Sequence, residues 1–319
     1  LLSVVIPVYN SQTSLPQLIG RLTSVLDKNC SKYEIILVND GSKDQSWQII
    51  QELSQNYPQI RAYDLMRNFG QHNALLCGIK EAQGDVIVTL DDDLQHPPEC
   101  IPDLLAKLEE GFDVVYGVPQ TEQHSGWRNL TSKLIKIFLK KAMRVPAAQE
   151  ISAFRAFRSD VKRSFSNYDG VFVSIDVLIS WGTTRFSSVK VDHHQRVFGK
   201  SQYSLKKLFN HAFTLITGFS IFPLQVSSGM GFLSILFGVV VLIYVFIKYL
   251  TSGGAVPGFT FLASIIAIFS GAQLFAIGII GEYLGRLYSR TIGQPTYVIR
   301  AQCPDKSLKN DYKAMGRKE

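Results

Sequence analysis

The stretch 90-LDDDLQHPPE-99 places three carboxylates and a glutamine directly after VIVTL, an apolar run typical of a buried strand. Asp91 and Asp93 alternate by two positions, so on an extended chain both side chains point the same way and Asp92 points elsewhere. Gln95 continues the series. Carboxylate and amide oxygens are hard ligands that suit Mg²⁺ or Mn²⁺. An acidic surface turn would have the same composition, so the neighbouring segments must decide between a site and a turn.

Short apolar runs alternate with helical patterns through the first part of the chain. Such alternation predicts an α/β fold in which helices cover both faces of a mostly parallel sheet. Ligands of these sheets bind outside the carboxyl ends of the strands. The acidic run, Asp40 and the pair Tyr9-Asn10 each follow a predicted strand, so we expect them to face one crevice. Strands are predicted at 3–9, 33–40, 60–66, 84–93 and 112–118, and helices at 14–29, 44–57 and 71–83.

Two long segments of the second half, 208–247 and 249–281, contain no Asp, Glu, Lys or Arg. Within them, 230–247 and 259–281 each supply about 20 apolar residues, enough to cross a hydrocarbon core of about 30 Å. The connection TSGGAVPG is uncharged and both outer flanks are basic, so the positive-inside rule places both termini in the cytoplasm. Two buried helices of a soluble protein are the alternative, which runs of this length disfavour.

The net charge of +7 over 319 residues favours an anionic partner such as nucleic acid, a phospholipid surface or a phosphorylated substrate. A soluble nucleic-acid binder would explain the charge but not the apolar segments, so no nucleic acid is expected. The four cysteines lack metal-ligand or disulfide spacing, which suits a reducing compartment. No signal peptide is expected, because the chain opens with the strand-like SVVIPVY.

An amphipathic pattern follows the predicted strands. The segment WRNLTSKLIKIFLKKAMRV carries leucines and lysines on different faces at helical spacing, as in a helix that lies in a membrane interface. The segment YSLKKLFNHAFTLITGFSIFPL has a similar character just before the first apolar run. Helices packed on the sheet are the alternative for both segments.

Five segments occur in the order of one enzyme family: SVVIPVYN, VNDGSKDQS, MRNFGQHNALLCGI, TLDDDLQHPPE and RVFGKSQYSLKKL. They resemble family 2 glycosyltransferases with the GT-A fold. More narrowly, they resemble the polyprenyl-phosphate glycosyltransferases, which include dolichyl-phosphate mannose synthase and the bacterial undecaprenyl-phosphate glucosyltransferases. The resemblance implies a GT-A domain over 1–205 with an interfacial helix at about 125–145, a juxtamembrane helix over 206–226, two transmembrane helices over 227–285 and a basic cytoplasmic tail over 286–319.

The implied activity is the inverting transfer of a hexose, with UDP-glucose as donor, to undecaprenyl phosphate on the cytoplasmic face of a bacterial plasma membrane. Mg²⁺ or Mn²⁺ would neutralise the charge that develops on the leaving diphosphate. GDP-mannose and other sugar nucleotides stay open as donors, and a thin two-helix anchor is compatible with a homo-oligomer. A processive polysaccharide synthase would need more spans and a Q-x-x-R-W signature, which this sequence lacks.

The resemblance also assigns roles to individual residues. The ring of Tyr9 would lie against the base and Asp40 would accept from its donor atoms. Arg128 and Ser132, four positions apart on the predicted interfacial helix, would share a face and hold the acceptor phosphate. The metal site would comprise Asp91, Asp93 and Gln95, with Asp93 also counted as catalytic. Nucleotide contacts fall to Pro7, Tyr9, Asn10, Asp40, Arg67, Gly70 and Asp91, and acceptor or diphosphate contacts to Arg128, Ser132, Arg155, Arg196 and Lys200.

Two positions depart from the family pattern. Pro119 stands where an arginine is usual. Related bacterial enzymes read DFR where this chain reads AFR, so Ala153 occupies the place of the family's candidate general base, an aspartate. Alanine can neither take a proton nor orient an acceptor phosphate. We therefore predict that this chain is inactivated at Ala153 by a natural or engineered change. A catalytically inactive sugar-nucleotide-binding membrane protein is the alternative function.

Overall fold

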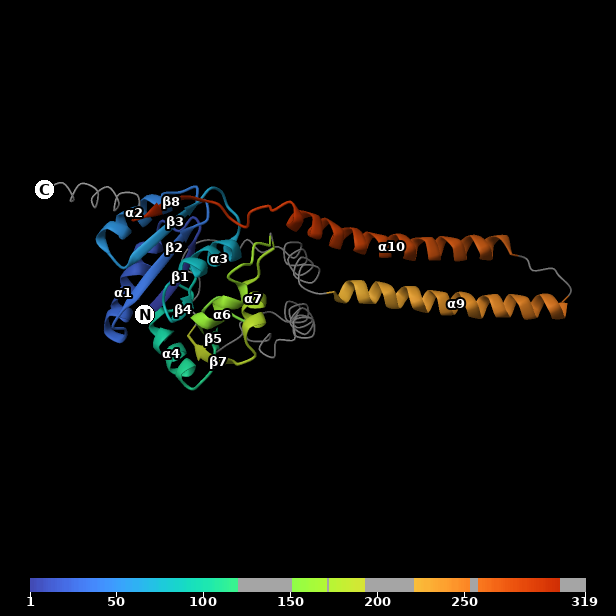
Figure 1. Ribbon diagram of the computed structural model, residues 1–319, viewed down its shortest axis with the longest axis horizontal. Coiled ribbons are helices and arrows are strands. Elements are labelled where there is room, and N and C mark those ends of the chain that lie inside the picture. Colours follow the sequence, from blue (N-terminus) through green and yellow to red (C-terminus); the bar gives the residue numbers. More distant parts are fainter. Residues whose placement is uncertain (120–150, 171, 193–220, 253–257, 305–319) are drawn as a thin grey trace. The chain divides into compact units, whose positions relative to one another are not determined.

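The computed structural model contains two units that are described separately. One comprises residues 1–203 together with 294–319, and the other comprises residues 204–293. The structure describes residues 1–119, 151–170, 172–192, 221–252 and 258–304 (Figure 1).

The first unit is built on an eight-stranded sheet in the order β7-β5-β6-β4-β1-β2-β3-β8. Four of the seven strand pairings are parallel, and the antiparallel ones all involve β6 or β8. The predicted α/β fold with a mostly parallel sheet is confirmed. The strands are β1 Leu2–Val8, β2 Tyr33–Asn39, β3 Ile60–Leu65, β4 Val86–Thr89, β5 Val114–Pro119, β6 Arg155–Arg158, β7 Phe186–Val191 and β8 Ile299–Cys303.

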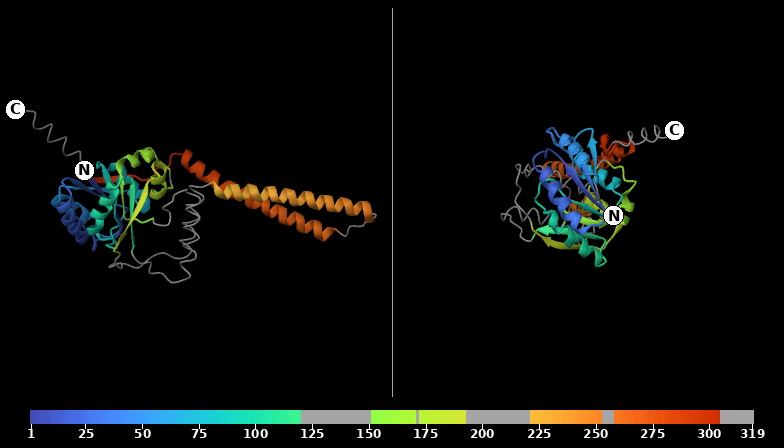
Figure 2. Two further views of the ribbon diagram at one scale, coloured as in Figure 1. Left: turned by 90° about the horizontal axis from the view of Figure 1, so that it is seen from below. Right: turned by 90° about the vertical axis from the view of Figure 1, so that its left-hand side faces the viewer.

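Helices cover both faces of this sheet (Figure 1 and Figure 2). Successive residues of a strand point to opposite faces: Val4 and Ile6 of β1 enter one core cluster, whereas Val5 enters the other. The first cluster includes side chains of α1, α2 and α4, and the second includes side chains of α3 and α7. The helices of this unit are α1 Leu15–Asn29, α2 Ser46–Asn56, α3 Gln71–Glu81, α4 Ile101–Glu109, α6 Ser159–Lys162 and α7 Ile175–Gly182.

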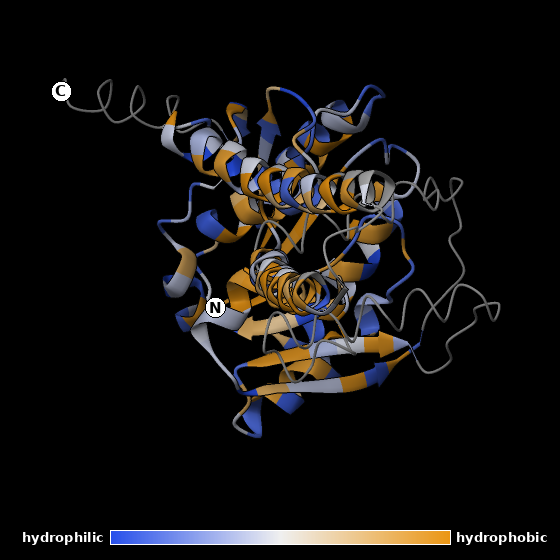
Figure 3. Cartoon of the chain, turned by 90° about the vertical axis from the view of Figure 1, so that its right-hand side faces the viewer, coloured by the Kyte–Doolittle hydropathy of each residue, from blue (hydrophilic) through white to orange (hydrophobic). Residues whose placement is uncertain are grey.

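The second unit contains two long helices, α9 Phe222–Ser252 and α10 Phe259–Thr291. Hydrophobic residues run along both of them (Figure 3), and the rings of Phe237 and Phe269 stack between them with centroids 6.4 Å apart. By length and composition, the segments Phe222–Lys248 and Ile268–Thr291 are each able to cross a membrane. They are two candidate transmembrane helices.

Two of the predicted domain boundaries require correction. Residues 222–226, predicted as part of a juxtamembrane helix, open the long helix α9. Within the predicted basic tail over 286–319, residues 286–291 complete α10 and residues 299–303 form β8. Without β8, β3 would be an edge strand with unpaired backbone groups; pairing with β8 gives these groups hydrogen-bond partners. The first unit therefore includes chain from both sides of the two candidate transmembrane helices.

Candidate active site

The carboxyl ends of β2, β1 and β4 lie side by side. Val8 of β1 pairs with Asn39 of β2, and Val5 pairs with Thr89 of β4, all in parallel. Tyr9, Asp40 and the acidic turn 91–93 therefore leave the same edge of the sheet from three adjacent strands, as the sequence predicted.

The acidic turn is held in place by its middle carboxylate. One oxygen of Asp92, Oδ2, accepts a hydrogen bond from the backbone N of Tyr9 at 3.0 Å and another from the hydroxyl of Ser11. Burial raises the pKa of Asp92, while these two donors act in the opposite direction. Asp92 thus holds the end of β4 against the end of β1.

The prediction that Asp91 and Asp93 point the same way assumed an extended chain, and that geometry is wrong, because residues 91–93 form a turn. The strand β4 stops at Thr89, and Leu94 adopts a left-handed backbone with φ of 60°. Asp91 Oδ1 accepts from Nε2 of Gln71 at 2.7 Å, at the first residue of α3. Asp93 Oδ1 accepts from the backbone N of Gln95 at 3.1 Å, which is a local turn contact.

The metal question depends on the donors available at this turn. Asp91, Asp93 and Gln95 are half-buried rather than enclosed, and their side chains offer only oxygen atoms or an amide, which suit Mg²⁺ or Mn²⁺. Among the residues that the structure describes, no group of three or more His, Cys, Asp or Glu is arranged to hold a metal ion. A cation held here would therefore rest on two protein carboxylates and need further oxygen ligands, such as those of a diphosphate.

Asp40 is 2% exposed and holds the loop that leads into α3. Its Oδ1 accepts from the backbone N of Phe69 at 2.7 Å, and its Oδ2 accepts from that of Gly70 at 2.9 Å. Burial raises the pKa of Asp40, and the two amides and the charge of Arg67 offset part of that rise. The predicted contact of Asp40 with a nucleotide base stays a prediction, whereas its anchoring of residues 69 and 70 is observed.

Two glycines allow these loops to meet. Gly41 has φ of +63°, and a Cβ there would lie 2.6 Å from backbone atoms of Arg67 and Asn68. Gly70, the N-cap of α3, has φ of +96°. Both backbones lie in the region that favours glycine. The guanidinium carbon of Arg67 lies 4.4 Å from the centre of the Phe69 ring, on the exposed side of the loop.

The end of β1 supplies the remaining predicted nucleotide residues. Pro7 is buried within β1, so its contribution is to the backbone of the sheet. Tyr9 is 43% exposed and its ring is available to a ligand. Asn10 has φ of 54°; its backbone N donates to Ser42 Oγ at 3.0 Å and its Oδ1 accepts from the backbone N of Lys43 at 2.8 Å. Asn10 therefore ties the β1 end to the loop after Asp40.

Ala153 lies next to the acidic turn. In the antiparallel pairing of β4 with β6, Thr89 faces Arg155, so residue 153 lies at the point where the chain continues from Thr89 into Asp91. The hydroxyl of Thr89 donates to the carbonyl oxygen of Ala153 at 2.7 Å. The following Phe154 stacks on His96 with ring centroids 5.5 Å apart, and His96 is 8% exposed. The residue in the place of the expected acid is thus at the edge of the site.

The predicted contact of Arg155 with the acceptor or the diphosphate needs correction. Its side chain is 2% exposed and forms an ion pair with Asp176, whose Oδ1 also accepts from the Tyr116 hydroxyl at 3.1 Å. A guanidinium held in this way is part of the core and is not presented to a diphosphate or an acceptor. The other residues assigned to those contacts, Arg128, Ser132, Arg196 and Lys200, lie outside the described residues.

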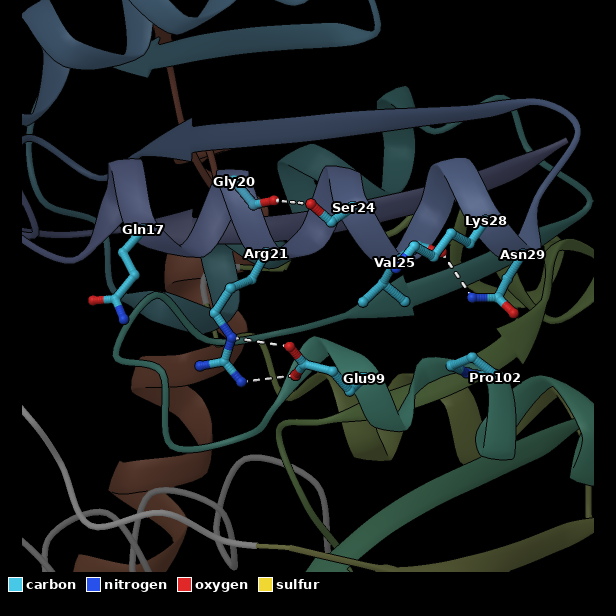
Figure 4. A pocket seen from close by; sticks show the side chains of 9 residues that line it. All are labelled: Gln17, Gly20, Arg21, Ser24, Val25, Lys28, Asn29, Glu99 and Pro102. Carbon is cyan, nitrogen blue, oxygen red and sulfur yellow. Dashed lines mark hydrogen bonds and ion pairs between the residues drawn. The ribbon is translucent and has the colours of Figure 1, made fainter.

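Two further residues belong to the site and were not predicted from the sequence: Gln71, whose amide contacts Asp91, and Ser11, whose hydroxyl contacts Asp92. Both lie within the family-like segments or directly after them, and this position was the available signal. A separate groove of about 540 Å³ runs between α1 and the turn that precedes α4, where Arg21 donates to Glu99 at 3.0 and 2.7 Å (Figure 4). None of the residues assigned to the site lines this groove.

The sequence of residues 3–165, just over half of the chain, matches the model of glycosyl transferase family 2. The chain belongs to glycosyl transferase family 2. The matched region contains the acidic turn, the loops around Asp40 and the residue Ala153.

Solved structures support the GT-A fold of this family 2 domain. Glucosyl-3-phosphoglycerate synthase from Mycobacterium tuberculosis, in complex with Mn²⁺, UDP and glucosyl-3-phosphoglycerate, is 18% identical with a TM-score of 0.51, over 68% of this chain and 77% of that chain. TarS 1-349 of S. aureus, in complex with UDP-GlcNAc, is also 18% identical, with a TM-score of 0.48 over 68% of this chain. The match spans 65% of the TarS chain, less than two thirds of its length. At 18% identity the likeness to glucosyl-3-phosphoglycerate synthase concerns the fold alone.

Proposed function

We propose that this family 2 protein has the site of an enzyme that transfers a hexose from a nucleoside diphosphate sugar to a polyprenyl phosphate at the cytoplasmic face of a membrane, and that Ala153 leaves this chain inactive. UDP-glucose and undecaprenyl phosphate are the favoured substrates; GDP-mannose or another sugar nucleotide would give the same reaction with another sugar. One observation carries the proposal. A single chain combines an acidic turn at the carboxyl edge of a GT-A sheet with two helices long and apolar enough to cross a membrane. A membrane-anchored catalytic domain suits an acceptor with a long apolar chain.

The donor would bind across the ends of β1, β2 and β4. Tyr9 would lie against the base, and the loop held by Asp40 would place Arg67 and Gly70 beside the nucleotide. Asp91, Asp93 and Gln95 would hold Mg²⁺ or Mn²⁺, whose oxygen preference they fit. When bound, the cation would neutralise the charge that develops on the departing diphosphate. The complex of glucosyl-3-phosphoglycerate synthase with Mn²⁺ and UDP supports this expectation.

The acceptor phosphate would be held by Arg128 and Ser132, with Arg196 and Lys200 closing over the diphosphates. An oxygen of the lipid phosphate would attack the anomeric carbon opposite the leaving group. The new carbon–oxygen bond forms as the bond to the diphosphate oxygen breaks, so the nucleoside diphosphate leaves and the configuration inverts. A phosphate is already ionised near neutral pH, so an acid at position 153 would orient the acceptor more than deprotonate it.

Ala153 favours a second candidate function. Without the acid, the chain would keep the donor residues and lose turnover, which describes a sugar-nucleotide-binding membrane protein. The intact carboxylates of the acidic turn and the position of Ala153 beside them favour an enzyme altered at one residue. We therefore propose that this chain is the inactivated form of a polyprenyl-phosphate glycosyltransferase, with both termini cytoplasmic and a homo-oligomeric membrane anchor as a compatible arrangement.

The test compares the Ala153 protein with its Ala153→Asp variant, both purified in detergent. Each receives a panel of radiolabelled sugar nucleotides, undecaprenyl phosphate, and either Mn²⁺ or Mg²⁺. The proposal expects a labelled lipid from the variant only, with a gain of about 10²-fold or more. Equal turnover by both forms would refute the inactivation. Metal-dependent nucleotide binding without lipid product from either form would favour the binding protein.

A further inference from the structure

The strand after the second candidate transmembrane helix reaches the loop of the candidate nucleotide site. β8 pairs antiparallel with β3, and their register shifts at Asp64 and Leu65, where β3 ends. Beyond this shift, the backbone N of Met66 donates to the carbonyl oxygen of Val298 at 2.9 Å. Met66 is the residue before Arg67, so the C-terminal segment is hydrogen-bonded to the start of the loop that Asp40 holds.

Arg300 strengthens this attachment with its side chain. Its Nη2 donates to the carbonyl oxygen of Met66 at 2.6 Å, and its Nη1 lies 3.5 Å from Oδ2 of Asp64. Asp64 is buried, and its Oδ1 accepts from Nδ2 of Asn39 at 2.7 Å. Asn39 is the last residue of β2 and directly precedes Asp40. The guanidinium therefore connects the two strand ends from which the nucleotide loops leave.

The same segment makes two further contacts within the first unit. Thr296 is 7% exposed, and its hydroxyl donates to the carbonyl oxygen of Gly170 at 3.3 Å. Tyr297 packs against the core cluster that contains Cys77 of α3. Burial is the main cause that raises the pKa of Tyr297, as expected for a phenol inside a packed cluster. Residues 296–300 are therefore held at Gly170, at the core cluster of α3 and at Met66.

We propose that Arg300 is a positioning residue for the donor, which acts through the 66–70 loop. It holds the carbonyl of Met66 so that the amides of Phe69 and Gly70 stay directed at Asp40, and Arg67 stays beside the candidate donor site. This inference rests on the proposed function for the identity of the ligand. It adds that the donor site depends on a segment of the chain that follows the candidate transmembrane helices.

The first measurement needs no ligand. Hydrogen exchange of the full chain in detergent is compared for Arg300→Met, Arg300→Lys and Arg163→Met. Arg163 is the matched control, because its side chain is 84% exposed and, within the part of the chain that the structure describes, forms an ion pair with the nearby Asp160. We expect faster exchange at residues 66–70 in Arg300→Met, an intermediate rate in Arg300→Lys and no change in Arg163→Met. Unchanged exchange in Arg300→Met would overturn the proposal.

The second measurement is donor affinity, with UDP-glucose and the other sugar nucleotides as probes in Mn²⁺. Loss of one hydrogen bond that orders the loop should weaken binding about 3- to 10-fold. In the Ala153→Asp background, KM should rise by a similar factor while kcat is kept. If the parent binds no sugar nucleotide, the proposed function fails, and the exchange data still decide the role of Arg300. A kcat that falls with KM unchanged, or an equal loss in Arg163→Met, would refute positioning.

Discussion

Asp92 and Asp93 are adjacent carboxylates, and we expect their removal to have opposite consequences. Asp92→Ala deletes the acceptor of the Tyr9 amide and of the Ser11 hydroxyl. Hydrogen bonds to a charged group contribute about 1.5–3 kcal/mol each. Water can replace the bond at Tyr9, which is 43% exposed, but less readily at Ser11, which is 8% exposed. The raised pKa of Asp92 means that its ionised form already carries a desolvation cost. We therefore expect Asp92→Ala to lower the free energy of unfolding by about 2–3 kcal/mol.

For a domain of this size, each kcal/mol shifts the unfolding midpoint by about 2–4 °C, so we expect a fall of roughly 4–12 °C. Intrinsic tryptophan fluorescence of the full chain in detergent measures it. The three tryptophans, Trp47, Trp127 and Trp181, all precede the two long helices, so the signal reports on the catalytic unit. Asp93→Asn is the matched control: its midpoint should change by less than about 2 °C, while Mn²⁺-dependent donor binding weakens at least about tenfold.

The two variants can contradict this reasoning in distinct ways. A normal midpoint for Asp92→Ala with lost metal-dependent binding would make Asp92 a ligand and remove its role as a brace. Equal losses of stability in both variants would mean that the turn is held as a whole and not through Asp92. Adding Ser11→Ala to Asp92→Ala should cost little more, because the two groups share one interaction.

Three further predictions concern stability. Gly41→Ala should cost more than about 2 kcal/mol, because its φ of +63° and the backbone atoms 2.6 Å from the added methyl both oppose a side chain; urea unfolding measures it. Arg155→Met should cost about 3–5 kcal/mol by leaving Asp176 buried without its cation, and the double variant Arg155→Met with Asp176→Asn should recover part of that loss. Burial raises the pKa of Glu34, but its hydrogen bonds, including that from Arg61, outweigh burial, so the pKa lies below the ordinary value of a glutamate. The contribution of ionised Glu34 to the free energy of unfolding is therefore complete above about pH 4.5 and is lost as the pH falls through the lower pKa of the folded state. In Glu34→Gln, the free energy of unfolding should therefore fall less steeply with falling pH.

The central strands and the helices between them could be predicted because their signal is local. Apolar runs and helical periodicity define β1, β2 and β3 without reference to the rest of the chain. β8 could not be predicted in this way: IRAQC is short and half polar, and it becomes a strand because β3 has an open edge to pair with. β6 likewise depends on its position between β4 and β5. Pairing between distant segments leaves little trace in either segment alone.

In the candidate site, too, local sequence signals could be predicted and contacts between distant residues could not. Tyr9, Asp40 and the acidic turn were predicted together because the carboxyl ends of parallel strands share an edge. The orientation of individual side chains was not predictable. Asp92 is directed by Ser11, 81 positions away, and Arg155 is drawn into the core by Asp176. A motif therefore located the residues, whereas their long-range partners determine which of them can reach a ligand.

The position of Ala153 beside the acidic turn leads to a prediction about charge. Residue 153 lies beyond the Thr89–Arg155 pair, beside the turn that carries Asp91 and Asp93. A carboxylate introduced there would join two others, and like charges oppose one another's ionisation. Ala153→Asp should therefore lower the tryptophan-monitored unfolding midpoint in EDTA, and added Mn²⁺ should raise the midpoint more in the variant than in the parent. The same Mn²⁺ response in both proteins would mean that residue 153 is not part of the cation's surroundings, and the proposed inactivation would then need an explanation other than a missing acid beside a bound cation.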